Sequence, residues 1–153
     1  MTALVSASAL LGAALFACGG SPRATESDAA ARIVAQAIAR PANVPVGMPF
    51  DVELTATNVT SVPIGLTLTS GCAFSYEIQT ANGRVVVAPT YPCTTVIRSL
   101  TLASGAVLLE TYRYEIGEAL LPRLAPGVYR IVPTLNLGDI PGLIIRGVSV
   151  EVR

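Results

Sequence analysis

The feature that most constrains the fold of this chain is a strict alternation of apolar and polar side chains. In the segment Phe50–Asn58, apolar residues occupy even positions up to Ala56 and polar residues occupy the odd positions. The segments 74–80 and 148–153 alternate in the same way. Successive side chains of a strand point to opposite faces, so this period predicts strands with one face on a core and the other in water.

Weaker strand signals and short turn motifs fill most of the remaining sequence. Turns are predicted at Asn82-Gly83, Ser104-Gly105 and Pro126-Gly127, whose residues accept the backbone angles of tight turns. Many short strands with frequent turns predict a single all-β domain over residues 32–153, an antiparallel sandwich of about seven to nine strands. The further candidate strands are 32–39, 64–69, 84–88, 96–102, 107–116 and 128–134.

Two segments fit this scheme less well. Residues 116–124 have the pattern of a helical turn before Pro122, and residues 135–142 predict a loop that contains apolar side chains. Leu137 and Ile140 in that loop either form an exposed contact surface or fold back over one end of the sandwich. We favour folding back, because apolar residues on loops usually cover a core.

The first twenty residues have the outline of an export signal. An apolar run over residues 3–17 ends in Leu15-Phe16-Ala17-Cys18, which is similar to the lipobox of bacterial lipoproteins, although no charge precedes Arg23. We therefore expect a signal peptide over residues 1–17 and lipid attachment at Cys18. The alternatives are a plain cleaved signal peptide and an uncleaved anchor, but a bilayer span needs roughly 20 apolar residues and this run is shorter.

Residues 18–31 predict a flexible tether, because after the cysteine they are small and polar and include nothing large to bury. Such a spacer holds a folded domain a short distance from a membrane. We accordingly expect an exported lipoprotein of the bacterial cell envelope, attached to the membrane through an N-terminal lipid. A secreted soluble protein is the alternative.

Cys72 and Cys93 are the two cysteines outside this leader, and each lies beside an expected strand. In an oxidising compartment such a pair predicts a disulfide. Metal binding is the weaker alternative, because two thiolates without any His and without CxxC spacing fall short of a four-ligand zinc site.

Composition argues against the common catalytic sites. The chain has no His, and ten basic residues balance ten acidic ones. The absence of His removes Ser–His–Asp and Cys–His arrangements, and scattered charge offers little to nucleic acid. Carboxylate pairs among Glu110, Glu115, Glu118 and Asp139 are formally possible, but an outward, solvated strand face explains Glu110. We expect no enzyme activity, catalytic residue, cofactor, metal or nucleic-acid partner.

Several motifs occur in the order of a known family. They lie at residues 49–58, 66–72, 74–78 and 82–86, with closing motifs at 100–105 and 124–129. Together they resemble the BsuPI-type intracellular proteinase inhibitor domain over roughly residues 46–132. The resemblance implies an immunoglobulin-like sandwich and, by name, peptidase inhibition.

Some motif residues have a physical explanation that does not involve inhibition. Asn58 ends a strand, where its side chain can bond nearby backbone. Tyr129 follows Pro126-Gly127 and resembles a tyrosine corner, whose ring is buried and whose hydroxyl returns to nearby backbone. These residues indicate the fold, and one fold can have many unrelated functions.

Two functions fit these observations. In the preferred one, an anchored sandwich binds another envelope protein or polymer through an edge strand or loops and does no chemistry. The alternative is a proteinase inhibitor that presents a stiff loop to a peptidase active site. The candidate loop is Pro89, Thr90, Tyr91 and Pro92, which two prolines restrain beside Cys93.

Overall fold

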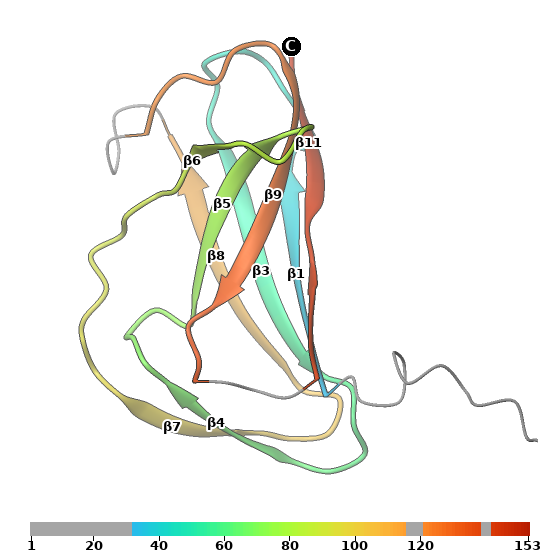
Figure 1. The fold of residues 1–153 in the computed structure, drawn as a ribbon, viewed down its shortest axis with the longest axis vertical. Coiled ribbons are helices and arrows are strands. Elements are labelled where there is room, and N and C mark those ends of the chain that lie inside the picture. The colour runs from blue at the N-terminus through green and yellow to red at the C-terminus, as the bar shows by residue number, and fades with distance from the viewer. Residues whose placement is uncertain (1–31, 116–120, 139–141) are drawn as a thin grey trace, which may run out of the picture.

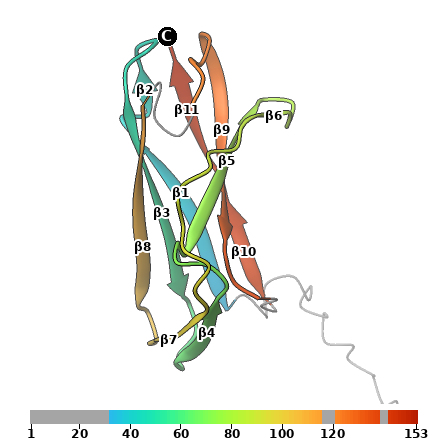
Figure 2. The ribbon, with the colours of Figure 1, turned by 90° about the vertical axis from the view of Figure 1, so that its left-hand side faces the viewer.

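The computed structural model describes residues 32–115, 121–138 and 142–153, which form eleven strands and contain no helix. Two sheets pack face to face, as the edge view in Figure 2 shows. The predicted all-β sandwich is therefore confirmed, but two strand pairs run parallel, whereas an antiparallel sandwich was predicted. The expected signal peptide, tether and lipidation site at Cys18 lie outside the described residues.

The first layer is a four-stranded sheet in the order β10-β1-β3-β8. The central strand β3 pairs antiparallel with β1 and β8, whereas β10 runs parallel to β1. The strands of this layer are β1 (Ile33–Arg40), β3 (Phe50–Asn58), β8 (Val107–Tyr114) and β10 (Leu143–Arg146).

The second layer is a five-stranded sheet in the order β2-β11-β9-β5-β6. Its strands are β2 (Asn43–Val44), β5 (Phe74–Thr80), β6 (Val85–Val87), β9 (Gly127–Leu135) and β11 (Val148–Val152). The chain passes from the first layer to the second at Gly147, between β10 and β11. A β carbon at Gly147 would lie 2.7 Å from the carbonyl oxygen of Ile131, so this crossing requires a glycine.

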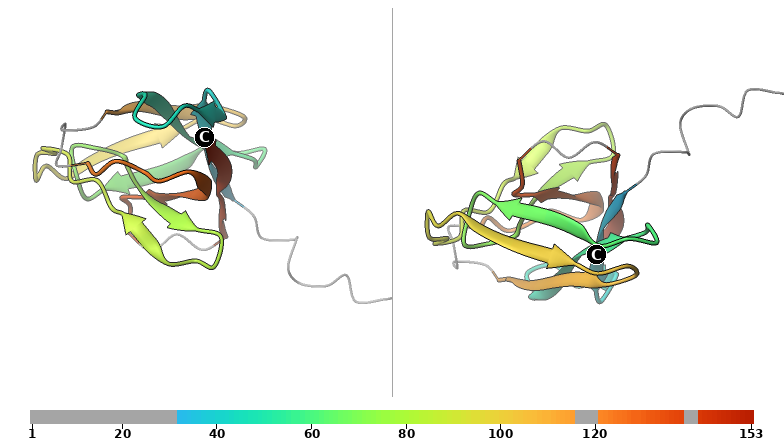
Figure 3. Two further views of the ribbon diagram at one scale, coloured as in Figure 1. Left: turned by 90° about the horizontal axis from the view of Figure 1, so that it is seen from above. Right: turned by 90° about the horizontal axis from the view of Figure 1, so that it is seen from below.

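A separate antiparallel pair, β4 (Ile64–Leu68) and β7 (Arg98–Leu102), lies across one end of the sandwich. Figure 1 shows this pair below the two layers, and the view from below in Figure 3 shows both strands crossing that end. Strand β1 begins at the same end, where the backbone N–H of Val59 donates to the carbonyl oxygen of Arg32 at 3.1 Å.

The core lies between the two sheets and follows the predicted alternation. In β3 the side chains of Val52, Leu54 and Ala56 are fully buried, and those between them are half-buried. From the facing sheet, Ile78 and Ile131 are equally buried. Complete burial of one such aliphatic side chain stabilises the fold by roughly 2 kcal/mol.

Strand boundaries differ from the prediction in two places. The strand predicted at 96–102 begins only at Arg98, because residues 88–97 form a loop. Strand β10 was not predicted, because the run Leu143–Arg146 does not alternate. With the two-residue β2, it brings the described strands to eleven rather than about seven to nine.

Of the predicted helical turn and apolar loop, the structure describes only part. Residues 116–120 and Ile140 lie outside the described residues, and residues 121–124 form no helix. Leu121 and Leu124 are nevertheless buried in the core. Leu137 forms a β-bridge with Leu68 and packs against the core, so its predicted folding back is confirmed.

The predicted roles of Asn58 and Tyr129 are also confirmed. The hydroxyl of Tyr129 donates to the carbonyl oxygen of Ala125 at 2.9 Å, and its ring is buried. The side-chain oxygen of Asn58 accepts the backbone N–H of Thr60 at 2.9 Å. Asn58 also donates to the carbonyl oxygens of Val62 and Leu102. This single buried amide therefore joins the turn before β4 to the end of β7.

Candidate functional site

The segment 88–97 between β6 and β7 contains the four residues of the candidate loop. It bows out along one side of the sandwich in Figure 1. Viewed from that side in Figure 2, it runs down between β8 of the first layer and β5 of the second. The segment therefore covers the side on which the sandwich would otherwise be open.

A disulfide attaches this segment to the start of β5. Cys72 and Cys93 are bonded, with their Cα atoms 5.4 Å apart, so the predicted bridge is confirmed. Beside the bridge, the N–H of Gly71 donates to the carbonyl oxygen of Thr94 at 2.8 Å. A β carbon at Gly71 would lie 3.2 Å from the backbone nitrogen and oxygen of Thr94, so this approach is close enough to favour glycine.

Tyr91 provides the second attachment. Its hydroxyl lies 2.9 Å from the hydroxyl of Tyr76, and its ring centroid lies 4.5 Å from that of Tyr112. Tyr91 and Pro89 are half-buried, whereas Thr90 and Pro92 are exposed. The structure thus divides the candidate loop between residues that hold it and residues that face solvent, and Tyr91 belongs to the first group.

Behind Tyr91, the carboxylate of Glu110 connects the two layers. It accepts the backbone N–H groups of Ala73 at 2.9 Å and Phe74 at 3.1 Å. The hydroxyl of Tyr112 lies 2.7 Å from this carboxylate and 2.8 Å from the carbonyl oxygen of Phe74. Glu110 and Tyr112 belong to β8, and Ala73 and Phe74 lie at the start of β5, so these bonds bridge the sandwich.

The sequence interpretation of Glu110 as an outward, solvated residue is wrong. Glu110 is half-buried and shares its strand face with Tyr112 and the buried Tyr114. The spacing of Glu110 from Tyr112 and Tyr114 could have indicated this position, since residues two apart on a strand share a face. It was obscured because Val107 and Leu109, which are apolar, occupy the opposite and exposed face of the strand.

Tyr76 and Tyr112 remain neutral at ordinary pH. Burial raises the pKa of Tyr76, and its hydrogen bond to Tyr91 adds to the effect. Burial also raises the pKa of Tyr112, as does the hydrogen bond to Glu110. The hydroxyls therefore act as hydrogen-bond donors that hold the loop, and their protons are harder to remove than those of free tyrosine.

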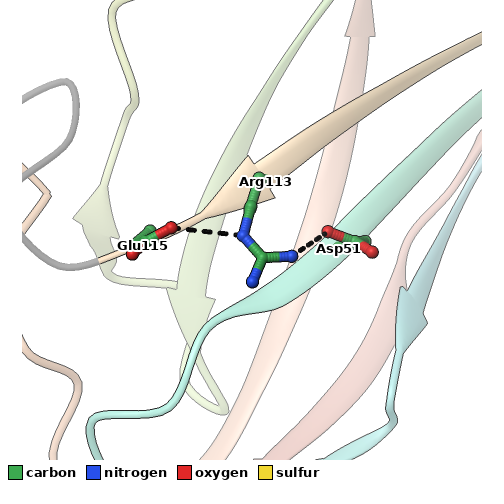
Figure 4. Close-up of polar contacts among 3 residues, drawn as sticks. All are labelled: Asp51, Arg113 and Glu115. Atoms are coloured by element: carbon green, nitrogen blue, oxygen red, sulfur yellow. Dashed lines mark hydrogen bonds and ion pairs between the residues drawn. The ribbon is translucent and has the colours of Figure 1, made fainter.

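The outer face of the first sheet carries exposed ion pairs at the end remote from β4 and β7. Figure 4 shows Arg113 between two carboxylates, with Asp51 at 3.4 Å and Glu115 at 3.2 Å. These side chains are about half exposed, so each pair contributes little to stability. Glu115, one of the formal acid–base candidates, is thus an ion-pair partner, and Glu118 and Asp139 lie outside the described residues.

The described ranges 32–115, 121–138 and 142–153 contain neither a cluster of metal-ligating side chains nor a membrane-spanning helix. Within them, no three or more His, Cys, Asp or Glu side chains gather as metal ligands would. No helix there is long and apolar enough to cross a membrane.

No family model matches this sequence, and no curated protein matches it. Three similar solved structures are the alkylpurine DNA glycosylase AlkC of Pseudomonas fluorescens, the CARDB domain of the PF1109 protein of Pyrococcus furiosus, and a β-glucosidase of Listeria innocua. AlkC, bound to DNA in that structure, is 16% identical with a TM-score of 0.48; the match covers 80% of this chain and 31% of AlkC. The CARDB domain, in complex with di-metal ions, is 15% identical with a TM-score of 0.48, over 79% of this chain and 87% of the domain.

The β-glucosidase is 17% identical with a TM-score of 0.42, and the match covers 78% of this chain. The chain spans 31% of AlkC and 16% of the glucosidase, so it corresponds to a small part of each enzyme. These similarities say nothing about binding or catalysis by this chain.

Proposed function

We propose that this chain is a non-catalytic lipoprotein of the cell envelope whose BsuPI-like sandwich serves as a protein-binding or structural module. The main support for this proposal is that segment 88–97 is fixed to the sandwich at two neighbouring points. These points are the Cys72–Cys93 disulfide and the contacts of Tyr91. Between and beyond these attachments the chain presents exposed side chains. They are Ala88, Thr90, Pro92, Thr94, Thr95, Val96 and Ile97.

A loop held in this way suits recognition. Ordering a mobile loop on binding costs free energy, and a segment already fixed by a disulfide and two prolines has lost much of that freedom beforehand. Functional contacts in small sandwiches commonly come from loops on a rigid scaffold. The segment therefore meets the physical requirement for a binding surface without any reactive group.

The compartment is inferred from the cysteines. A disulfide persists in oxidising surroundings such as the bacterial periplasm or cell surface. The bridge between Cys72 and Cys93 supports export, and export is what the apolar leader and Cys18 predict. Lipid on Cys18 would leave no free thiol in the mature chain, because the chain has three cysteines.

Fractionation of bacteria that express the full chain tests this assignment. We expect the wild-type protein in the membrane fraction and the Cys18→Ser variant released from it. Cys72→Ser is the matched control, because it removes a cysteine but leaves the lipidation site. Recovery of both wild type and Cys18→Ser in the cytosol would contradict the proposal.

Proteinase inhibition is the second candidate, supported by the resemblance and by the restrained geometry of the loop. In this function the exposed side chains of Thr90 and Pro92 would enter the peptidase active site, while Tyr91 stays within the aromatic cluster. Tyr91→Ala would therefore loosen the loop rather than remove a contact.

A panel of purified proteases tests inhibition with a cleaner pair of variants. If the loop inhibits, Thr90→Arg should weaken inhibition at least tenfold. The matched control Thr67→Arg alters an exposed threonine of β4 outside the candidate loop 89–92, and should have no effect. The absence of stoichiometric inhibition by the wild-type protein would remove this function for the proteases tested.

A further inference from the structure

Five of the ten exposed large apolar side chains in the described residues gather at one end of the sandwich. Val59 and Val62 lie in the turn between β3 and β4, and Val107 begins β8. Val96 and Ile97 lead into β7, and Ile97 is 74% exposed. These five residues, with the β4–β7 pair between them, form what we call the apolar end.

The apolar end is held in a defined shape. The buried side chain of Asn58 donates to the carbonyl oxygens of Val62 and Ala103, at 2.8 and 3.1 Å. The hydroxyl of Ser104 donates to the carbonyl oxygen of Thr60 at 2.7 Å. The exposed valines therefore stand on turns that are fastened to each other, so they stay exposed rather than collapsing onto the core.

The chain enters the domain at this end. The backbone of Arg32 is hydrogen-bonded to that of Val59, and Arg32 lies fourteen positions after Cys18 in the sequence. Even fully extended, a chain of fourteen residues spans no more than about 50 Å. A lipid on Cys18 would therefore keep the apolar end, more than any other part of the domain, close to the membrane.

The charge at this end also suits a lipid surface. Residues 59–68 and 96–106 contain no Asp or Glu, and Arg32 and Arg98 are exposed there. The carboxylates of Asp51 and Glu115 lie at the opposite end, where Arg113 pairs with them (Figure 4). Exposed apolar groups with nearby Arg favour the headgroup region of a membrane, above all one with anionic lipids.

We propose that the apolar end lies against the lipid surface to which the chain is anchored, so that β4 and β7 face the membrane. This inference rests on the proposed lipoprotein function. It adds an orientation, in which the ion-paired end with Asp51 and Arg113 points away from the bilayer. The outward hydroxyls of Thr67, Ser99 and Thr101 would then meet headgroups.

Single tryptophans report this orientation, because the chain has none of its own. The full protein, purified from membranes, is reconstituted into vesicles of phosphatidylethanolamine and phosphatidylglycerol, with or without brominated acyl chains. The probe variants are Ile97→Trp and Val62→Trp. The control is Met48→Trp, which is 57% exposed and precedes β3 at the far end of the sandwich.

We expect brominated lipid to quench Ile97→Trp and Val62→Trp at least threefold more than Met48→Trp, with blue-shifted emission at the two probe sites. Equal quenching at all three sites, or none, would overturn the proposal. In particular, an unquenched apolar end on vesicle-bound protein would show that lipid does not cover this end and would leave it available to a protein partner.

Sedimentation of the same samples separates this failure from failure of the proposed function. Protein that sediments with vesicles but shows no difference between sites retains its anchor and lacks the orientation. Protein that does not sediment with vesicles, and has no lipid by mass, refutes the anchor itself and the orientation with it. A circular dichroism spectrum like that of the wild type confirms that each variant is folded.

Discussion

At the residue scale, the side chain of Asn58 makes hydrogen bonds to several separate parts of the backbone. It is completely buried and bonds to the backbone of Val62, Leu102, Ala103 and Thr60. Removal of a buried amide with this many partners destabilises the fold, because the partner groups are left without a hydrogen bond.

Asn58→Ala is therefore expected to lower the free energy of unfolding by roughly 3 kcal/mol, because buried carbonyl groups lose their donor. Urea unfolding followed by circular dichroism measures the change. Thr57→Ala, one residue earlier on the half-buried outer face, should cost much less. Equal losses for the two variants would show that the Asn58 bonds are unimportant.

The raised pKa of Tyr114 predicts how stability depends on pH. Burial raises the pKa of Tyr114 to about 12, and electrostatic contact with Tyr129 and Tyr91 adds to the shift. An unfolded chain loses this proton near pH 10, so between pH 10 and 12 the unfolded state binds fewer protons than the native state. The stabilisation is complete below pH 10 and disappears as the pH rises through the native pKa.

We expect the urea midpoint to fall between pH 9 and 12, and to fall less steeply in Tyr114→Phe. That variant also loses the hydrogen bond from Tyr114 to the carbonyl oxygen of Pro122, so its midpoint at pH 7 is lower. The slope against pH is the informative quantity. An identical slope in both proteins would refute a raised pKa at Tyr114.

At the scale of elements, the sandwich depends on links between β8 and the start of β5. Glu110→Ala is expected to destabilise the fold by about 2 kcal/mol, because the N–H groups of Ala73 and Phe74 lose a charged acceptor. A double-mutant cycle with Tyr112→Phe should show coupling above about 0.5 kcal/mol, since the two side chains share a bond. Strict additivity would contradict the link.

Removal of the disulfide is also expected to lower the free energy of unfolding. Its cysteines are 21 residues apart, and closing a loop of that size stabilises by roughly 3 kcal/mol in the chain-entropy model. Unfolding of the wild type with and without a reductant measures this contribution, and the double variant Cys72→Ala with Cys93→Ala should unfold like the reduced protein. No shift on reduction would mean that the bridge does not form.

The alternating strands were predictable because burial on one face leaves a period of two in the sequence. Strand β3 was predicted with its observed limits for this reason. Strand β10 was not, because it lies where the chain changes sheets and so has no consistent inward face. The disulfide followed from cysteine count, but the inward positions of Tyr91 and Glu110 depend on contacts between strands distant in sequence.

At the scale of the whole molecule, the two ends of the sandwich differ. The apolar end contains Val62 and Ile97 and the point where the chain enters at Arg32, while the other end contains exposed ion pairs around Arg113. Between them, the disulfide-bound segment 88–97 faces solvent along one side. An anchor at Cys18 would give these surfaces distinct neighbours, lipid at one end and a partner protein or polymer at the side.

The proposed envelope protein is both anchored and oxidised, and intact mass spectrometry of protein recovered from bacterial membranes reports both properties. Spectra are recorded with and without reduction, so one sample reports leader cleavage and cysteine state together. We expect a chain that begins at Cys18, carries two or three acyl groups and gains two hydrogens on reduction. A full-length chain without lipid and with three free thiols would contradict it.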